Sequence, residues 1–114
     1  MNQVRKLTYI REKASEHIAG GNEKILWSLH AVKKLRIEKL WKDPVEQALK
    51  DAILIEDYPE HGRPLPDCLL LGFVDSDPIH VVVAIDETFD RVMIVTVYRP
   101  DIKRWENDWK RRKQ

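Results

Sequence analysis

The stretch IHVVVAIDETFDRVMIVTVY, residues 79–98, decides the fold predicted for this 114-residue chain. Two runs rich in β-branched residues, 79–86 and 91–98, flank a short acidic connection, a pattern typical of an antiparallel hairpin. Two further apolar runs, 53–58 and 69–74, precede it and are bounded by proline, glycine and aspartate. Because the connections after the first loop are short, we expect the four strands to form one antiparallel sheet.

Apolar residues at helical spacing predict helices at 2–18, 23–41 and about 43–52. The pair Gly20-Gly21 ends the first helix, and Asp43-Pro44 caps and begins the third. The expected buried residues are Val4, Leu7, Ala14 and Ile18 in the first helix, Ile25, Leu29, Val32 and Leu40 in the second, and Val45, Ala48, Leu49 and Ala52 in the third.

The end of the chain completes the expected architecture. Residues 101–112 are predicted to form a helix with Trp105 and Trp109 on one face. The order of helices, strands and a final helix indicates an α+β fold, with N-terminal helices packed on a four-stranded antiparallel sheet and a C-terminal helix. We expect an N-terminal helical extension, residues 1–22, and one domain, residues 23–114.

Charge is distributed unevenly, although the net charge is only +1. Residues 1–42 hold ten Lys/Arg against four acids, residues 43–90 two against twelve, and residues 91–114 eight against three. Basic ends that meet in the fold would attract a polyanion such as RNA, whereas solvated helix faces would give the same pattern without a partner. The single cysteine excludes an internal disulfide, and no apolar run approaches the ~20 residues of a membrane span, so we expect a cytoplasmic protein.

One histidine of the predicted second helix has a suitable neighbour for phosphate chemistry. In WSLHAVKKL, residues 27–35, Lys34 follows His30 by one helical turn on the same face. An imidazole can move protons near neutral pH, while an ammonium group can hold negative charge. The edge of an ordinary amphipathic helix would look the same.

The last hairpin holds the other polar candidates, Thr96, Tyr98 and His80. Strict alternation puts Thr96 and Tyr98 on one face with Val92 and Ile94, and the other face holds Arg91, Met93, Val95 and Val97. His80 lies opposite Thr96 in one register and on the face of Val95 and Val97 in the neighbouring ones. No Asn-Gly or Asp-Gly turn selects between these registers, so a common site for His80 and Tyr98 stays open.

No metal or cofactor is predicted. His61 and His80 with Asp57 or Asp86 lack the tight spacing of metal ligands. Neither Gly62 nor Gly72 belongs to a phosphate-binding motif.

Four segments in order, SLHAVKKL (28–35), CLLLGF (68–73), PIHVVVAI (78–85) and IVTVYRPD (94–101), resemble one bacterial and archaeal family, catalogued as domain of unknown function 4258. The first is similar to the family signature S-x-H-A-x-x-R-M. The resemblance covers about residues 27–105. It implies a branch of the RelE/barnase-like superfamily of small metal-independent ribonucleases, in which many members are toxins of type II toxin–antitoxin pairs.

Carried over by position, the resemblance implies four catalytic residues, namely His30, His80, Thr96 and Tyr98. Lys34 replaces the signature arginine, which keeps the charge but loses bidentate phosphate geometry. The expected substrate-binding residues are Lys34, Arg91 and Arg99. The implied partners are RNA, such as mRNA with or without the ribosome, and a small antitoxin of the zinc-finger (MqsA-like) type.

The expected activity is metal-independent cleavage of single-stranded RNA by attack of the ribose 2′-OH on the adjacent phosphate. One alternative is a non-catalytic module of the same fold that binds RNA or protein. Another is an interacting subunit that uses Trp105, Trp109 and the basic tail to hold an acidic partner.

Overall fold

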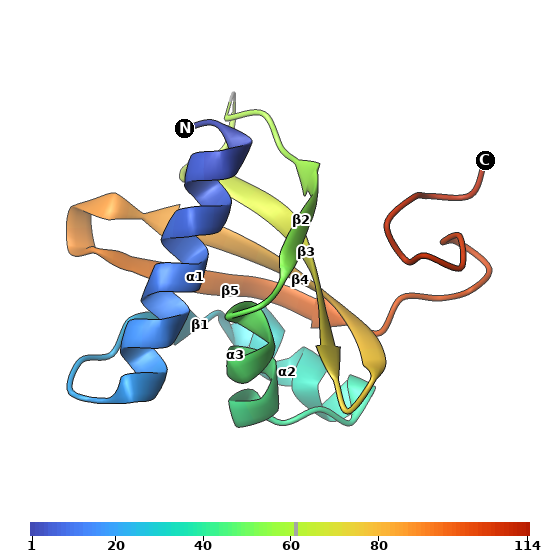
Figure 1. The fold of residues 1–114 in the computed structure, drawn as a ribbon, viewed down its shortest axis with the longest axis horizontal. Helices are drawn as coiled ribbons and strands as arrows, with labels where there is room; N and C mark the ends of the chain where they lie inside the picture. The colour runs from blue at the N-terminus through green and yellow to red at the C-terminus, as the bar shows by residue number, and fades with distance from the viewer. Residues whose placement is uncertain (61) are drawn as a thin grey trace.

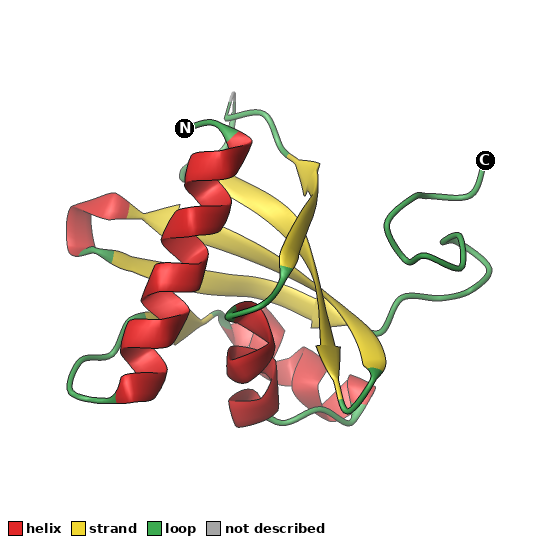
Figure 2. Ribbon diagram, viewed as in Figure 1, coloured by secondary structure: helices red, strands yellow, loops and turns green. Residues whose placement is uncertain are grey.

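The computed structural model describes residues 1–60 and 62–114 as an α+β fold built on one sheet (Figures 1 and 2). In chain order the elements are α1 (Gln3–Ala19), β1 (Ile25–Trp27), α2 (Leu29–Glu38), α3 (Lys42–Leu49), β2 (Ile53–Asp57), β3 (Asp67–Val74), β4 (Asp77–Asp86), the 3₁₀ helix η1 (Glu87–Phe89) and β5 (Arg91–Tyr98). The five strands lie in the order β1-β5-β4-β3-β2. No helix within the described ranges has the length and apolar character needed to cross a membrane.

The predicted four-stranded antiparallel sheet is wrong, because β1 adds a fifth strand that runs parallel to β5. This segment was expected to begin the second helix. Instead, Gly20 and Gly21 adopt positive φ angles of 91° and 103°, which favour glycine, in the turn that precedes β1. Ile25 then pairs with Val92 and is buried. The pairing occupies backbone groups that would otherwise form an open edge of β5.

The inner face of the sheet is covered by α1 and α3 and carries the hydrophobic core (Figure 1). The residues of the third helix region expected to be buried are all buried, namely Val45, Ala48, Leu49 and Ala52. Close approach of α3 to β3 depends on Gly72, since an added Cβ there would lie 3.2 Å from Ala48 Cβ.

The predicted apolar stripes of the first two helices are wrong in part. Val4 of α1 is 75% exposed, whereas Ile10 and Ala14 enter the core. In α2, Leu29 and Val32 are exposed, and the buried residues are Ala31 and Leu35. Ile25 belongs to β1 and Leu40 lies beyond the end of α2, so a stripe that includes these two residues has the wrong phase within α2.

The third helix and its cap begin two positions earlier than predicted. Trp41 occupies the N-cap of α3 without a side-chain hydrogen bond, so Asp43 lies inside the first turn. Pro44 is tolerated there because the first-turn N–H groups have no intrahelical acceptor.

The predicted C-terminal helix is absent, and residues 99–114 form an irregular hook after β5 (Figure 2). Asp101 and Asp108 accept hydrogen bonds from the backbone N–H of Lys103 and Lys110, two residues on. Such local side-chain bonds compete with helical ones. The hook closes on itself where Lys113 N–H donates to the Arg104 carbonyl at 2.8 Å.

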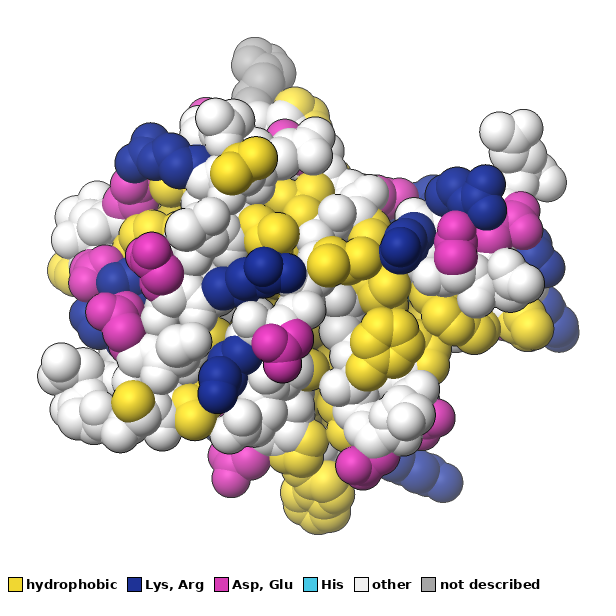
Figure 3. All heavy atoms as spheres, in the orientation of Figure 1, with side chains coloured by type: hydrophobic (Ala, Val, Ile, Leu, Met, Phe, Trp, Pro, Cys, Tyr) yellow, Lys and Arg dark blue, Asp and Glu magenta, His cyan; other side chains and the backbone are white. Residues whose placement is uncertain are grey.

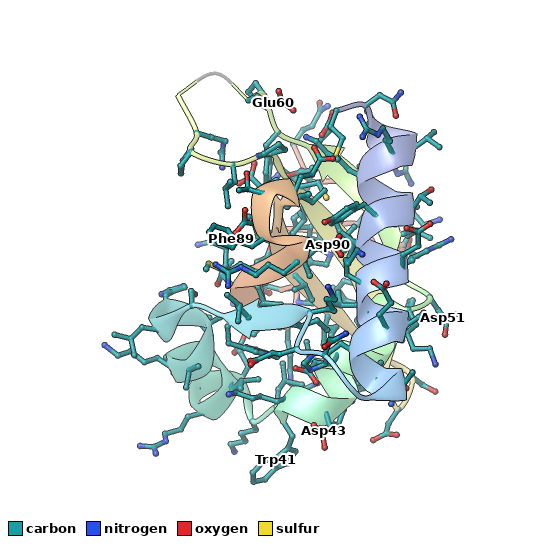
Figure 4. All side chains as sticks on the ribbon, turned by 90° about the vertical axis from the view of Figure 1, so that its left-hand side faces the viewer. Trp41, Asp43, Asp51, Glu60, Phe89 and Asp90 are labelled. Carbon is teal, nitrogen blue, oxygen red and sulfur yellow. The ribbon has the colours of Figure 1, made fainter. Side chains whose placement is uncertain are left out.

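Asp90 fastens α1 to the sheet, and Figure 4 shows it beside that helix. Its carboxylate accepts from the Tyr9 hydroxyl at 2.9 Å and contacts Lys13 Nζ at 2.7 Å and Lys24 Nζ at 3.0 Å. The Lys13 ammonium, followed by Lys24 and Tyr9, holds the pKa of Asp90 well below its usual range.

Lys6 forms a second polar link and is only 1% exposed. Its ammonium group pairs with the Asp57 carboxylate and donates to the carbonyls of Asp67, at 2.9 Å, and Tyr58, at 3.3 Å. A buried cation of this kind is tolerated because each donor has an acceptor.

Candidate functional site

Two bulges turn polar side chains onto the outer face of the sheet, the face opposite α1. His80 pairs with Tyr98 and Val82 with Thr96, after which Val83 pairs with Ile94. The additional residue in β5, Val95, reverses the alternation there. Thr96 and Tyr98 therefore lie opposite Val92 and Ile94, which corrects the prediction that all four share a face. His80 shares the outer face with Tyr98.

The second bulge acts in the same way on β2. Leu54 pairs with Leu70, and the next pair is Glu56 with Leu69, so Ile55 is the additional residue. Without it, Glu56 would follow Leu54 onto the inner face. The bulge places the Glu56 carboxylate on the outer face.

His30 reaches the outer face from the first turn of α2. The Ser28 hydroxyl accepts from Ala31 N–H at 3.0 Å and donates to the Val95 carbonyl at 2.8 Å, so it caps the helix and fastens it to the bulge of β5. His30 Nε2 then lies 3.0 Å from Thr96 Oγ1, and the imidazole remains exposed. Lys34, one turn further on, is half-buried.

His80 is fully buried and has both ring nitrogens occupied. Nε2 lies 2.7 Å from the Trp109 carbonyl, and Nδ1 lies 3.1 Å from the Tyr98 hydroxyl. Since a carbonyl only accepts, Nε2 carries the hydrogen and Tyr98 donates to Nδ1. Burial lowers the pKa of His80 and raises the pKa of Tyr98, so both groups are neutral near pH 7.

The C-terminal hook covers His80. Trp105, which is buried, contacts the imidazole edge-on, with ring centroids 4.3 Å apart. The Arg112 guanidinium lies 4.7 Å from the Trp105 ring and donates to both Glu56 oxygens, at 2.6 and 3.0 Å. This bidentate pair lowers the pKa of Glu56. The tryptophans predicted to hold an acidic partner thus pack within the chain or contribute a backbone carbonyl.

A basic pocket of about 430 Å³ lies between α2, the end of β5 and the hook. Its lining comprises Lys34, Glu38, Tyr98, Arg99, Asp101, Arg104, Trp105 and Arg112. Arg99 is held by the carbonyls of Glu38 and Lys39 and lies 3.6 Å from an Asp77 oxygen. Within the described residues, Lys34 and Arg104 have no ion-pair partner.

Arg91 lies away from this pocket, although it was predicted to bind substrate. It pairs with Asp86 at 3.1 Å and packs on Phe89 at the turn between β4 and β5. Tyr98 is at the opposite end of the same strand, seven residues on. The structure therefore joins His30 to Thr96 and brings Lys34, Tyr98 and Arg99 together in the pocket, while His80 lies beneath the hook.

Sequence reasoning missed Glu56, Arg104 and Arg112, because neither the bulge in β2 nor the path of the hook has a signal in the alternation pattern. His61, which was considered as a metal ligand, lies outside the described residues. Among the residues that are described, no three His, Cys, Asp or Glu side chains gather as a metal centre.

The fold and this cluster define a small α+β domain whose mixed sheet presents polar and ionisable side chains on its outer face. Residues 27–99 match the family model described as "Domain of unknown function (DUF4258)". The match covers more than half of the chain, so the protein belongs to this family, as its sequence segments indicated. No curated protein and no solved structure gives a significant match. The matched range contains the predicted catalytic residues, and α1 and residues 100–114 of the hook lie outside it.

Proposed function

We propose that the protein is a RelE/barnase-like endoribonuclease, the toxin of a type II toxin–antitoxin pair, and that it cleaves single-stranded RNA without a metal ion. The observation that carries this proposal is the exposed His30–Thr96 pair beside the basic pocket. The pair supplies a proton carrier and a hydroxyl that orients it. The pocket beside it supplies Lys34 and Arg104, two cations without an ion-pair partner among the described residues.

In the proposed reaction, a neutral nitrogen of His30 takes the proton of a ribose 2′-OH, whose oxygen attacks the adjacent phosphorus. The bond from phosphorus to the 5′ oxygen breaks, and water protonates that oxygen. The products are a 2′,3′-cyclic phosphate and a 5′-hydroxyl. Lys34 and Arg104 offset the charge that develops on the phosphate.

The buried groups have a positioning role in this scheme. The proton of Tyr98 is engaged by His80, so its oxygen is an acceptor for a ribose or base donor rather than an acid. His80, enclosed by the hook, orients Tyr98 and makes no contact with RNA in this arrangement. This differs from the catalytic role that the resemblance implies for His80.

Purified protein with fluorescent single-stranded RNA in EDTA tests the proposal. We expect cleavage with a 2′,3′-cyclic phosphate end and no cleavage of DNA of the same sequence, because DNA lacks the 2′-OH. His30→Gln should reduce the rate by about 10²-fold or more. Lys34→Ala should weaken cleavage, and Lys33→Ala, the same change on the adjacent exposed residue, should not. Absence of cleavage, cleavage that requires added metal, or full activity of His30→Gln would refute the proposal.

A non-catalytic RNA-binding module is the second candidate, and the burial of His80 favours it because only one imidazole of the described residues remains accessible on the outer face. Fluorescence anisotropy with the same RNA distinguishes the two. Binding by both the wild type and His30→Gln, without products, would indicate the module. Growth arrest on expression, lost in His30→Gln and relieved by the product of an adjacent reading frame, would support the toxin and its antitoxin.

A further inference from the structure

A groove of about 1000 Å³ lies where α2 ends and α3 begins, and its α2 residues differ from those that line the basic pocket. Its apolar lining consists of Val32, Leu35, Leu40, Trp41 and Pro44. In Figure 3, hydrophobic side chains gather along the lower edge of the molecule, where Figure 1 places α2 and α3. Leu35 and Leu40 form the buried floor of the groove, whereas Val32 and Trp41 are exposed to solvent.

Trp41 is the most exposed large hydrophobic residue of the described chain, at 78%. Figure 4 shows its ring at the end of the molecule, pointing away from the body. It occupies the N-cap of α3 yet makes no capping hydrogen bond, so the local structure does not require a tryptophan there. An indole of this kind beside an apolar groove is typical of a binding surface.

The rim of the groove is basic. Arg36, Lys39 and Lys42 line it, and Asp43 is the one acid among the lining residues. Within the described residues, none of the three cations forms an ion pair. Lys42 Nζ also lies 5.9 Å from the centre of the Trp27 ring. The three positive charges would attract the carboxylates of an acidic partner.

We propose that this groove binds an acidic amphipathic helix of a partner protein, with Trp41 as the central anchor. Aliphatic side chains on the floor offer no hydrogen-bonding groups to nucleotide bases, whereas leucine-type side chains spaced along one helix face would fill the groove. Acidic residues on the flanks of that helix would meet Arg36, Lys39 and Lys42. A second copy of this chain is a poorer match, because its own α1 and α2 are basic on balance.

The proposal is independent of RNA cleavage. Lys34 and Glu38 of α2 line the basic pocket, and Val32 and Arg36 line the groove, so two sides of one helix serve two surfaces. A partner bound in the groove would leave His30 and Thr96 in contact with solvent.

Selection from a displayed library of helical 20-residue peptides tests the proposal for any helical partner. On the wild type we expect enrichment of peptides with net negative charge and apolar residues at i, i+3, i+4 and i+7. An enriched peptide should bind at least tenfold more weakly to Trp41→Ala, and Lys42→Glu should also weaken it. Lys50→Glu, at the other end of α3, should bind as the wild type does. Because Trp41 is exposed, its variants should keep the thermal midpoint of the wild type.

Several results would overturn the proposal. These are a selection without enrichment, enrichment of basic peptides or of peptides without the apolar spacing, and binding that Trp41→Ala does not change. Self-association abolished by Trp41→Ala would assign the groove to a second copy. Displacement of the peptide by single-stranded RNA, together with loss of RNA binding in Trp41→Ala, would assign it to nucleic acid.

Discussion

The imidazole of His30 and the hydroxyl of Thr96 lie 3.0 Å apart, Nε2 to Oγ1, although 66 residues separate them in the chain. The contact requires both the capped start of α2, which positions His30, and the bulge at Val95, which places Thr96 on the outer face. Within this pair His30 is exposed, whereas His80 is fully buried. The proposed chemistry therefore depends on the pair more than on His80.

Thr96→Val keeps the shape of the side chain and removes its oxygen, so His30 loses its orienting partner. We expect the rate of RNA cleavage to fall about tenfold, which corresponds to the loss of roughly 1.4 kcal/mol, near the value of one hydrogen bond. The thermal midpoint should change little because the imidazole is exposed. Single-turnover kinetics measures the effect, and Thr88→Val on η1 is the matched control. An unchanged rate would remove Thr96 from the site.

His80→Leu should destabilise the protein strongly. The substitution leaves the Trp109 carbonyl and the Tyr98 hydroxyl without their buried partner, at a cost of about 2–4 kcal/mol for the two groups together. Urea unfolding at pH 7.5 measures this difference. Tyr98→Phe, which removes only one of the two hydrogen bonds, should cost less.

Comparison of the wild type with His80→Leu also tests the lowered pKa of His80. The pKa of this histidine in the unfolded chain is about 6.5. Below that pH the unfolded chain binds a proton at residue 80 that the folded chain does not bind. Stability is therefore greatest above that pH and falls as the pH drops through the window below it. His80→Leu lacks this loss, so the wild-type advantage should shrink between pH 7.5 and pH 5. A constant or growing advantage would contradict the assignment of a neutral imidazole.

The sequence predicts the β4–β5 hairpin and the apolar face of the third helix because their alternation and spacing are carried by many residues. It fails where one residue changes the geometry. Val95 and Ile55 each insert a single position into a strand and move Thr96, Tyr98 and Glu56 to the opposite face. No side-chain pattern marks these insertions, since both are ordinary β-branched residues in apolar runs.

The failures at the two ends of the family match have another cause, which is tertiary context. Residues 25–27 have apolar spacing that suits a helix, yet the open edge of β5 pairs with them. Trp105 and Trp109 also have helical spacing, yet aspartates at 101 and 108 favour turns. The position of the hook over His80 depends on contacts with β2 and β4, which local sequence does not encode.

The pair between Glu56 and Arg112 should hold the hook over His80. We expect Arg112→Ala to accelerate chymotrypsin cleavage after Trp105 several-fold, because local opening then exposes that segment. Lys113→Ala, on a neighbouring residue, is the control. The reversed pair Glu56→Arg with Arg112→Glu should restore resistance in part, although its partial exposure limits the pair to about 1 kcal/mol or less. If Arg112→Ala resists cleavage like the wild type, other contacts hold the hook.

Asp90→Asn should lower the thermal midpoint at pH 7, because Lys13, Lys24 and Tyr9 lose their shared carboxylate. The folded pKa of Asp90 lies below its unfolded value of about 3.9, so its contribution is present above that pH and is lost as the pH falls. The difference between wild type and variant should therefore disappear in strong acid. Asp51→Asn, an exposed site without an ion pair among the described residues, is the control in differential scanning calorimetry. A midpoint that does not change at pH 7 would show that Asp90 does not contribute to holding α1 on the sheet.

Lys6→Met should destabilise the protein more than Asp90→Asn does, although methionine suits a buried helix position. The ammonium group neutralises Asp57 and satisfies the carbonyls of Tyr58 and Asp67. Removing one partner of a buried ion pair costs roughly 3–5 kcal/mol, and the part of Asp57 that water reaches favours the lower value. Urea unfolding checks this against Lys33→Met on the exposed side of α2. Adding Asp57→Leu to Lys6→Met should recover part of the loss, since a matched apolar pair leaves no buried charge. If Lys6→Met lowered the free energy of unfolding by less than about 1 kcal/mol, far below the loss expected for a broken buried ion pair, α1 would not depend on this pair.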